Sequence, residues 1–202
     1  MSGVAAIVLA AGQGARFGSD FKLLATLDGA PLVRRTTEAA LASNAHPIIV
    51  VLGHRCAEVA QALRDLDVTI IENISYRDGL STSLKAGFVA LSPAVEAAVV
   101  LLGDMPRVSE RTINQLIACW RAAGRPSAVI PTLAGRRGNP VVLSQALAPE
   151  IANLTGDAGA GRLLRDWPGV LEVAVDDPAI LKDIDTPEAL HALGSWLDRE
   201  AT

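Results

Sequence analysis

Short runs of consecutive apolar residues alternate along the chain with stretches in which apolar residues recur every three or four positions. The uninterrupted runs are 4–9, 48–52, 97–102 and 128–131, and 68–72 is a further expected strand that also contains Thr69 and Glu72. Each is far shorter than a membrane-spanning helix requires. Continuous apolar runs are typical of strands whose two faces are both buried in a parallel sheet. We therefore expect these runs to form one buried, mostly parallel sheet.

Helical periodicity occupies the segments between the apolar runs. The expected helices are 31–41, 56–64, 83–91 and 110–122. Pro31 suits a first helical turn, and Ser109 is a favourable N-cap for the last of these helices. Strands that alternate with helices indicate right-handed crossovers, with helices on both faces of the sheet. The expected fold class is α/β, a three-layer α/β/α sandwich.

The alternation becomes less regular after residue 131. We expect a loop at 136–140, a short strand at 141–143, a glycine-rich turn at 156–161, a strand at 171–175 and a closing helix at 187–197. Repeats, linkers and low-complexity segments are absent from the sequence. We therefore expect residues 1–202 to form a single domain. Its ligands should bind at the edge where the parallel strands end.

Composition and charge narrow the class of partner. The net charge of −4 gives no general attraction to a nucleic-acid backbone, so we expect no nucleic-acid partner and a phosphate site built from local donors. Cys56 and Cys119 lack metal-site spacing and are interpreted as ordinary thiols in a reducing compartment. The first apolar run has no basic flank and is interrupted by Gly12. We expect neither a signal peptide nor a membrane span, and a cytoplasmic location.

A glycine-rich loop follows the first expected strand. Its small residues let backbone N–H groups approach an anion, while Arg16 offers a planar pair of donors and Lys22 a mobile charge. We expect a site for the triphosphate of a nucleotide, made by Leu9, Ala10, Ala11, Gly12, Gly14, Arg16 and Lys22. The alternative is a tight strand-to-helix turn in which the basic residues are incidental.

Two other glycine-loop motifs do not match this loop. A Walker A loop needs a lysine directly after its last glycine, but Ser19 follows Gly18. A dinucleotide fingerprint has the spacing GxGxxG, and the segment from Gly12 to Gly18 is one residue too long for it. The second expected strand also lacks a terminal acidic residue. A Rossmann oxidoreductase is therefore disfavoured.

Aspartates follow the strand 97–102 and precede the last helix. Asp104 lies just past the apolar strand, at the expected ligand-binding edge. Asp183 and Asp185 are two residues apart, so an extended chain would point both to one side. Mg²⁺ prefers one or two carboxylates together with substrate phosphates. We expect Asp104 and one of the later pair, Asp185, to hold Mg²⁺, although Asp185 also suits a helix entry.

Taken together, several segments resemble the nucleotidyltransferases that attach nucleotides to the molybdenum cofactor. The segment from Ala10 to Leu24 resembles their LAAGxSxRMGxxKLL signature. The other matching segments are Gly79-Leu80-Ser81-Thr82-Ser83-Leu84, Leu102-Gly103-Asp104-Met105-Pro106, Arg137-Gly138-Asn139-Pro140-Val141, Gly156-Asp157-Ala158-Gly159-Ala160 with Arg162, and Asp183-Ile184-Asp185-Thr186-Pro187. These segments occur in the same order as in the family, and together they span nearly the whole chain.

The resemblance implies a Rossmann-like sheet of the nucleotide-diphospho-sugar transferase type. It implies a nucleotide-binding half at 1–131 and an acceptor-binding half at 132–202. Arg16, Lys22 and Asp104 would be catalytic, and Gly79, Ser81 and Ser83 would lie near the nucleotide or else cap the following helix. Asn139 and Arg162 would contact the acceptor, unless they are a turn asparagine and an exposed helix arginine without a ligand.

The double alanine at Ala10-Ala11 resembles the branch that uses CTP. The implied reaction transfers CMP to a molybdopterin-type acceptor with release of pyrophosphate. Gln13-Gly14 and Phe17 depart from the family's usual residues, so GTP remains an alternative. A sugar- or alditol-phosphate nucleotidyltransferase would share the loop and the metal aspartate. A non-catalytic chaperone that delivers cofactor to a molybdenum hydroxylase apo-enzyme would have the same ligand pocket. The sugar- or alditol-phosphate transferase and the chaperone therefore both remain alternatives.

Overall fold

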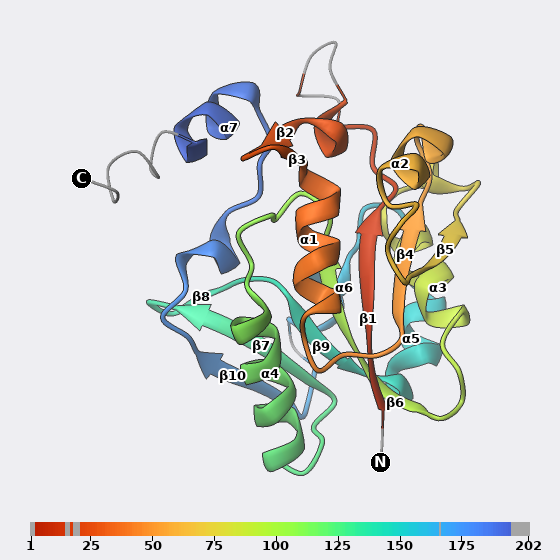
Figure 1. Cartoon of the computed structure of the whole chain (residues 1–202). Helices are drawn as coiled ribbons and strands as arrows, with labels where there is room; N and C mark the ends of the chain where they lie inside the picture. Colours follow the sequence, from red (N-terminus) through yellow and green to blue (C-terminus); the bar gives the residue numbers. More distant parts are fainter. Residues whose placement is uncertain (1–2, 15–16, 18–20, 166, 195–202) are drawn as a thin grey trace.

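The computed structural model describes residues 3–14, 17, 21–165 and 167–194. Among these residues, an eight-stranded sheet forms the centre, in the order β10-β7-β9-β6-β1-β4-β5 with β8 beside β7 (Figure 1). The strands are β1 Gly3–Ala10, β4 Ile48–Leu52, β5 Thr69–Glu72, β6 Val95–Leu102, β7 Ala128–Leu133, β8 Arg136–Arg137, β9 Val141–Ser144 and β10 Val170–Ala174. Strands β2 Thr26–Leu27 and β3 Ala30–Pro31 form a separate small hairpin.

Within the central sheet, four of the seven described strand pairs are parallel, so this sheet is mostly parallel as the apolar runs predicted. Strand β1 pairs in parallel with both β4 and β6, β4 with β5, and β7 with β10. Strand β9 is the central exception, antiparallel to both β6 and β7. A parallel connection needs a crossover of a dozen or more residues, and the link from β7 to β9 is shorter. The loop expected at 136–140 begins with β8, which pairs antiparallel with β7.

Helices lie between the strands along the chain. They are α1 Leu32–Leu41, α2 Cys56–Ala62, α3 Leu80–Val89, α4 Glu110–Ala122, α5 Ala148–Ala152, α6 Ala160–Leu163 and α7 Pro187–Gly194. The short 3-10 helices are η2 Lys22–Leu24, η3 Tyr76–Asp78, η4 Gln145–Leu147 and η5 Pro178–Leu181. The N-cap expected at Ser109 is confirmed, since its Oγ accepts the Thr112 N–H at 3.3 Å.

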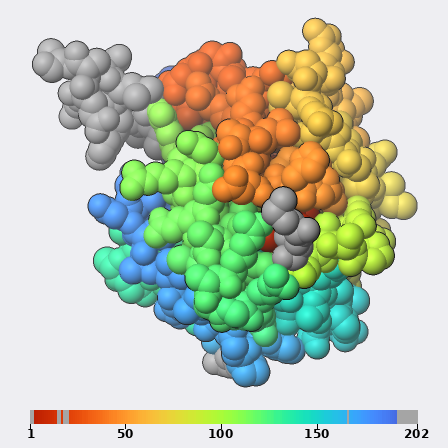
Figure 2. All heavy atoms as spheres, turned by 60° about the horizontal axis from the view of Figure 1, so that its bottom comes forward, coloured from red at the N-terminus to blue at the C-terminus, as the bar shows by residue number. Residues whose placement is uncertain are grey.

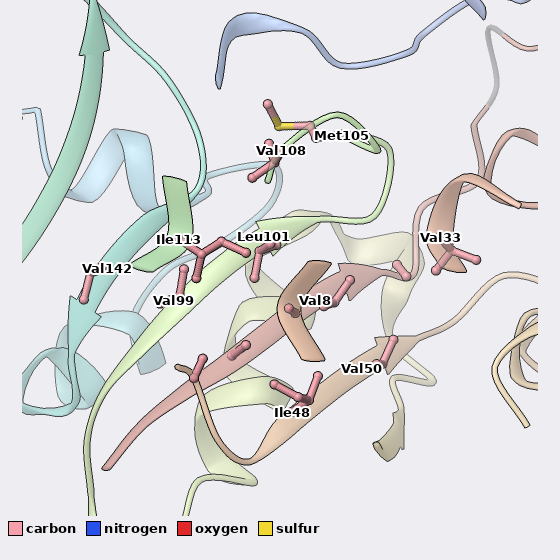
Figure 3. Close-up of a cluster of buried hydrophobic side chains, with 14 of the residues drawn as sticks. Val8, Val33, Ile48, Val50, Val99, Leu101, Met105, Val108, Ile113 and Val142 are labelled. Carbon is pink, nitrogen blue, oxygen red and sulfur yellow. The ribbon is translucent and has the colours of Figure 1, made fainter. Parts of the chain in front are cut away.

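Each central strand sends alternate side chains into two separate cores, which explains why whole strands are apolar. On one face, Val8, Val50 and Val99 pack with Val33 of α1 and Ile113 of α4 (Figure 3). On the opposite face, alternate residues of the same strands pack with α3 and α5. The expected three-layer α/β/α arrangement is confirmed.

Segments that are distant in sequence pack together across one face. Helix α4 contacts α1 and also β10. In Figure 2, the green segment that contains α4 lies among orange, cyan and blue segments from the rest of the chain. Within the described ranges, no helix combines the length and the apolar character needed to cross a lipid bilayer.

Candidate active site

A cleft of about 550 Å³ opens where β1 and β6 end. In Figure 1 this edge lies at the top, where the arrow of β1 points. The cleft is lined by Leu9, Ala10, Ala11, Gly12, Gln13, Gly14, Lys22, Leu23, Tyr76, Arg77, Gly79, Leu80, Ser83, Leu102, Asp104 and Asp157. Most residues expected from the first loop, and the first aspartate, therefore share one cavity.

The loop after β1 is held at its base by the neighbouring strand ends. Leu9 O accepts the Gly103 N–H at 2.9 Å, and Ala11 O accepts the His54 N–H at 3.1 Å. A Cβ on Gly12 would meet nothing within 4 Å, so the backbone there borders open space. Gly14 has a φ of 62°, in the left-handed region that favours glycine. Arg16, expected to bind phosphate, lies outside the described residues.

Three aspartates from distant segments meet at the end of β6. Carboxylate oxygens of Asp104, Asp183 and Asp185 lie within 4.8 Å of one another. The Ile184 N–H donates to Asp104 O at 3.0 Å, which fastens the later segment beside the earlier one. Because Ile184 points into a buried cluster, the residues on either side of it turn toward Asp104. The sequence pointed to Asp185 as the second ligand, and the structure brings in Asp183 as well.

This donor set suits a hard divalent cation. The three carboxylates are oxygen ligands of the kind that Mg²⁺ and Mn²⁺ accept. Asp104 Oδ1 is buried and has no hydrogen-bond partner among the described residues. An orphaned buried carboxylate oxygen is costly unless a cation or donor reaches it. The residues present therefore fit a divalent metal ion.

Lys22 joins the glycine-rich loop region to the aspartates. Its Nζ donates to Asp104 Oδ2 at 2.6 Å and to Asp185 Oδ1 at 2.8 Å. Burial lowers the pKa of Lys22, but Asp104 and Asp185 outweigh this effect and hold the pKa above its ordinary value. The ammonium group is therefore charged at neutral pH and lies beside the acidic cluster.

The N-terminus of α3 also contributes to the lining of the cleft. Gly79 has a φ of 105°, and a Cβ there would lie 2.2 Å from the Gly156 carbonyl carbon. The Ser81 N–H donates to Gly156 O at 3.1 Å, while its side chain is buried away from the cleft lining. Ser83 lines the cleft. Helix α3 begins at Leu80 without a capping side chain, so the capping alternative holds for Gly79, which is the N-cap residue, and is wrong for Ser81 and Ser83.

A second cavity of about 230 Å³ adjoins the first and shares Leu9, Leu80 and Leu102 with it. Asn139, for which an acceptor contact was predicted, is among its lining residues. Arg162 is exposed on α6 and is not part of this lining, although its neighbours Ala160 and Gly161 are. The structure therefore brings Asn139, but not Arg162, to the wall of this cavity.

Several residues of the cleft were not predicted from the sequence. Tyr76 and Arg77 lie between β5 and α3, in a segment without strong periodicity, and both line the cleft. Asp157 belongs to a glycine-rich motif in the sequence that predicts no role for it, and it also lines the cleft. Only their position in the sequence could have indicated them, because Tyr76 and Arg77 shortly precede Gly79, the N-cap residue of α3.

Comparison with known protein families gives one match over most of the chain. A family model described as a MobA-like NTP transferase domain matches residues 6–173. Nicotine blue oxidoreductase from Paenarthrobacter nicotinovorans is 31% identical over 196 residues, covering 94% of this chain and 96% of that protein.

Solved structures with the same fold agree with this match. A nucleotidyl transferase from Methanothermobacter thermautotroptrophicus superposes with a TM-score of 0.83 at 25% identity, covering 99% of this chain and 100% of the other. The manganese complex of Rv0371C from Mycobacterium tuberculosis H37Rv has a TM-score of 0.80 at 24% identity, covering 96% of this chain and 98% of the other. At 24% identity, the similarity to Rv0371C shows a shared fold.

Proposed function

Because the chain belongs to the MobA-like NTP transferase family and is a nucleotidyltransferase, we propose that it transfers CMP from CTP to the terminal phosphate of a molybdopterin-type acceptor. The observation that carries this proposal is that the glycine-rich loop, Lys22 and Asp104 line one cleft, and that Asp183 and Asp185 cluster with Asp104. The double alanine at Ala10-Ala11 supports CTP over GTP through its resemblance to the branch that uses CTP.

In the proposed reaction, an oxygen of the acceptor phosphate attacks the α-phosphorus in line. The new bond joins that oxygen to phosphorus, the bond from phosphorus to the bridging oxygen breaks, and pyrophosphate leaves. A phosphate nucleophile is already mostly ionised near neutral pH, so the protein need not supply a base. The work of the protein is then to position the two substrates and neutralise their charge.

Each group of the cleft has a proposed part in this task. The backbone at Gly12 and Gly14 would bind the triphosphate, with Arg16 as a further proposed contact outside the described residues. Lys22 uses two of its three ammonium hydrogens on Asp104 and Asp185, so the third can reach a phosphate oxygen. Asp104, Asp183 and Asp185 would hold Mg²⁺, which would neutralise phosphate charge when bound.

The acceptor would lie on the side of the second cavity. Asn139 lines that cavity and can hydrogen-bond a heterocycle or a phosphate. Arg162 stays a proposed contact because it is exposed on the adjoining helix. Division into a nucleotide-binding half at 1–131 and an acceptor-binding half at 132–202 is part of the same proposal. A molybdenum hydroxylase apo-enzyme is the proposed recipient of the product, in the cytoplasm.

One experiment tests the proposal directly. The purified protein is incubated with Mg²⁺, molybdopterin and each of the four nucleoside triphosphates, and pyrophosphate is measured. We expect release with CTP. Release with GTP instead would show that the enzyme uses GTP. Release with sugar or alditol phosphates, but not with molybdopterin, would show that one of these phosphates is the acceptor. Cofactor binding without any release, together with co-purification of a molybdenum enzyme, would favour a chaperone.

One relative supports a second candidate function. Nicotine blue oxidoreductase carries an oxidoreductase name and matches almost the full chain. Hydride transfer from a nicotinamide cofactor would not require three clustered aspartates, so the acidic cluster favours transfer of a nucleotide. Consumption of NADH or NADPH with an oxidised dye, without pyrophosphate release in the first assay, would establish the oxidoreductase and exclude the transferase.

A further inference from the structure

The side chain of Asn73 lies behind the wall of the cleft, directly after β5. It is 6% exposed, and its backbone N–H donates to Leu52 O at 2.8 Å. Asn73 is not among the residues that line the cleft. Asn73 is connected to the cleft through α3, because its side-chain amide donates hydrogen bonds to two hydroxyl groups of that helix. Asn73 can therefore act on a ligand only through another residue.

The orientation of this amide is set by its contacts. Asn73 Oδ1 accepts the Ser75 N–H at 3.0 Å, so the oxygen faces that turn. The two hydrogens on Nδ2 then go to Thr82 Oγ1 at 2.8 Å and Ser83 Oγ at 3.0 Å. Rotating the amide by half a turn would leave the Ser75 N–H without its acceptor. Asn73 is therefore a donor toward both hydroxyl groups.

The two hydroxyl groups differ in what remains for their own hydrogens. Thr82 Oγ1 has two carbonyl acceptors, Gly79 O at 2.9 Å and Ser75 O at 3.0 Å. Ser83 Oγ has no acceptor for its hydrogen among the described residues, and one of its lone pairs faces Asn73. Ser83 is 3% exposed as a whole residue, and it lines the cleft. A buried hydroxyl hydrogen without an acceptor costs free energy, so a ligand that supplies one is favoured.

We propose that Asn73 is a positioning residue that leaves the Ser83 hydroxyl hydrogen to an acceptor atom of the nucleobase. The proposal rests on the proposed function, because it places the base of the triphosphate beside α3. The fitting base presents a carbonyl oxygen or an unprotonated ring nitrogen at this point. Cytosine offers O2 and N3 side by side, whereas guanine presents its 2-amino group and N1–H at the corresponding positions and has its acceptor O6 at the other end of that edge. Asn73 thus contributes to choosing CTP over GTP.

The variant Asn73→Asp reverses this arrangement without changing the size of the side chain. The carboxylate still accepts the Ser75 N–H, but it now accepts the Ser83 hydroxyl hydrogen as well. Only lone pairs of Ser83 then face the cleft, which disfavours an acceptor on the base. Binding of CTP, GTP and inorganic tripolyphosphate to the full chain is measured by calorimetry with Mg²⁺. We expect CTP affinity to fall about tenfold, GTP affinity to fall less, and tripolyphosphate affinity to stay unchanged.

Matched variants separate this effect from general damage. Asn114→Asp makes the same chemical change on α4, where Asn114 Oδ1 accepts the Asn44 N–H, and should leave all three affinities unchanged. Ser83→Ala should lower CTP affinity about tenfold, and adding Asn73→Asp to it should cause no further loss. If Asn73→Asp does not fold, Ser83→Ala still tests the contact on which the proposal depends, and CTP affinity equal to that of the wild type overturns the proposal.

Three further results would also overturn the proposal. They are unchanged CTP affinity in Asn73→Asp, equal losses for CTP and tripolyphosphate, and a full Asn73→Asp effect in the Ser83→Ala background. Equal wild-type affinities for CTP and tripolyphosphate would likewise exclude a base contact. Failure of the proposed reaction is distinguishable. A wild type that binds CTP with the expected variant pattern, but releases no pyrophosphate, contradicts the reaction and leaves the role of Asn73 supported.

Discussion

Asp104 uses its backbone and both carboxylate oxygens in different ways. Its carbonyl accepts the Ile184 N–H at 3.0 Å, and its Oδ2 accepts from Lys22 Nζ at 2.6 Å. Its Oδ1 is buried without a hydrogen-bond partner among the described residues. The backbone contact would survive a change of side chain, whereas the negative charge would not. Structure and charge can therefore be separated at this position.

We expect Asp104→Asn to lower pyrophosphate release at least about 100-fold, because removing one electrostatic group of an active site has an effect of this order. The amide keeps the shape of the side chain, so the circular dichroism spectrum should match that of the wild type. Asp67→Asn, at an exposed site outside the cleft lining, is the control and should retain full turnover. Turnover within a few-fold of the wild type in Asp104→Asn would remove this carboxylate from the mechanism.

Helix α3 and the segment 156–157 approach so closely that only glycine fits between them. Gly79, the N-cap residue of the helix, has a φ of 105°, and the Gly156 carbonyl carbon lies 2.2 Å from where a Cβ would stand. The contact is backbone against backbone, which cannot yield as a flexible side chain would. It fixes the start of α3, and with it Ser83, relative to the cleft.

Gly79→Ala should therefore push the two segments apart. We expect a loss of about 1–3 kcal/mol in the free energy of unfolding, from the strained φ and the clash, and weaker binding of CTP. Gly161→Ala is the control, because a Cβ there meets nothing within 4 Å and the residue lies in the short helix α6. Urea denaturation of both variants and CTP titration test this. An unchanged midpoint in Gly79→Ala would contradict the close approach.

An ion pair joins helix α1 to the segment that follows helix α2. Arg34 Nη1 and Nη2 donate to the two oxygens of Asp65 at 2.6 and 2.8 Å, and Nη1 also reaches Ala62 O. These hydrogen bonds from Arg34 lower the pKa of Asp65 to about 2. A carboxylate with a lowered pKa binds fewer protons in the folded state than in the unfolded state. Its contribution to stability is therefore present above its ordinary pKa and lost as pH falls toward 2.

We expect the difference in stability between the wild type and Asp65→Asn to be constant from pH 7 to about 5 and to shrink as pH falls toward about 2. Urea unfolding at a series of pH values measures this difference. The pair is exposed to solvent, so added salt should also reduce the difference. A difference that stays the same at pH 3 and pH 7 would contradict the lowered pKa.

The three aspartates come from two segments that lie far apart along the chain. Asp104 follows β6, while Asp183 and Asp185 lie between η5 and α7. Their carboxylates approach within 4.8 Å, and in the described structure Lys22 offsets part of the repulsion between them. The cluster exists only in the folded protein, because its two segments meet only there. A cation that binds it should therefore stabilise the folded state as a whole.

We expect Mn²⁺ or Mg²⁺ to raise the melting temperature of the protein, and chelation with EDTA to reverse the rise. At 100 times its dissociation constant, an ion that binds only the folded state adds about 2.7 kcal/mol. Asp185→Asn should reduce the rise while keeping the size of the side chain. Equal melting temperatures with and without the ion at millimolar concentration would contradict a divalent site in this cluster.

The sequence allowed most of the secondary structure, and part of the site, to be predicted. Strand 48–52 and helix 110–122 were predicted with the bounds that the structure has, because an uninterrupted apolar run marks the strand and a helical apolar period with the N-cap Ser109 marks the helix. The antiparallel β9 was not predicted as such, because strand direction depends on the path between strands. The roles assigned to the site residues remain predictions.

Hydrophobic periodicity reports the burial of each position, and burial is a local property that a sequence carries directly. Hydrophobic periodicity was therefore enough to predict a layered α/β fold and to place charged residues at the ends of its strands. Which of these residues meet is a matter of distance in space. The Ile184 N–H bond to Asp104 brings both later aspartates into the cluster, and Asn73 acts through the hydroxyl of Ser83, ten residues along the chain. Neither contact leaves a period in the sequence, because each joins segments that only the packed sheet brings together.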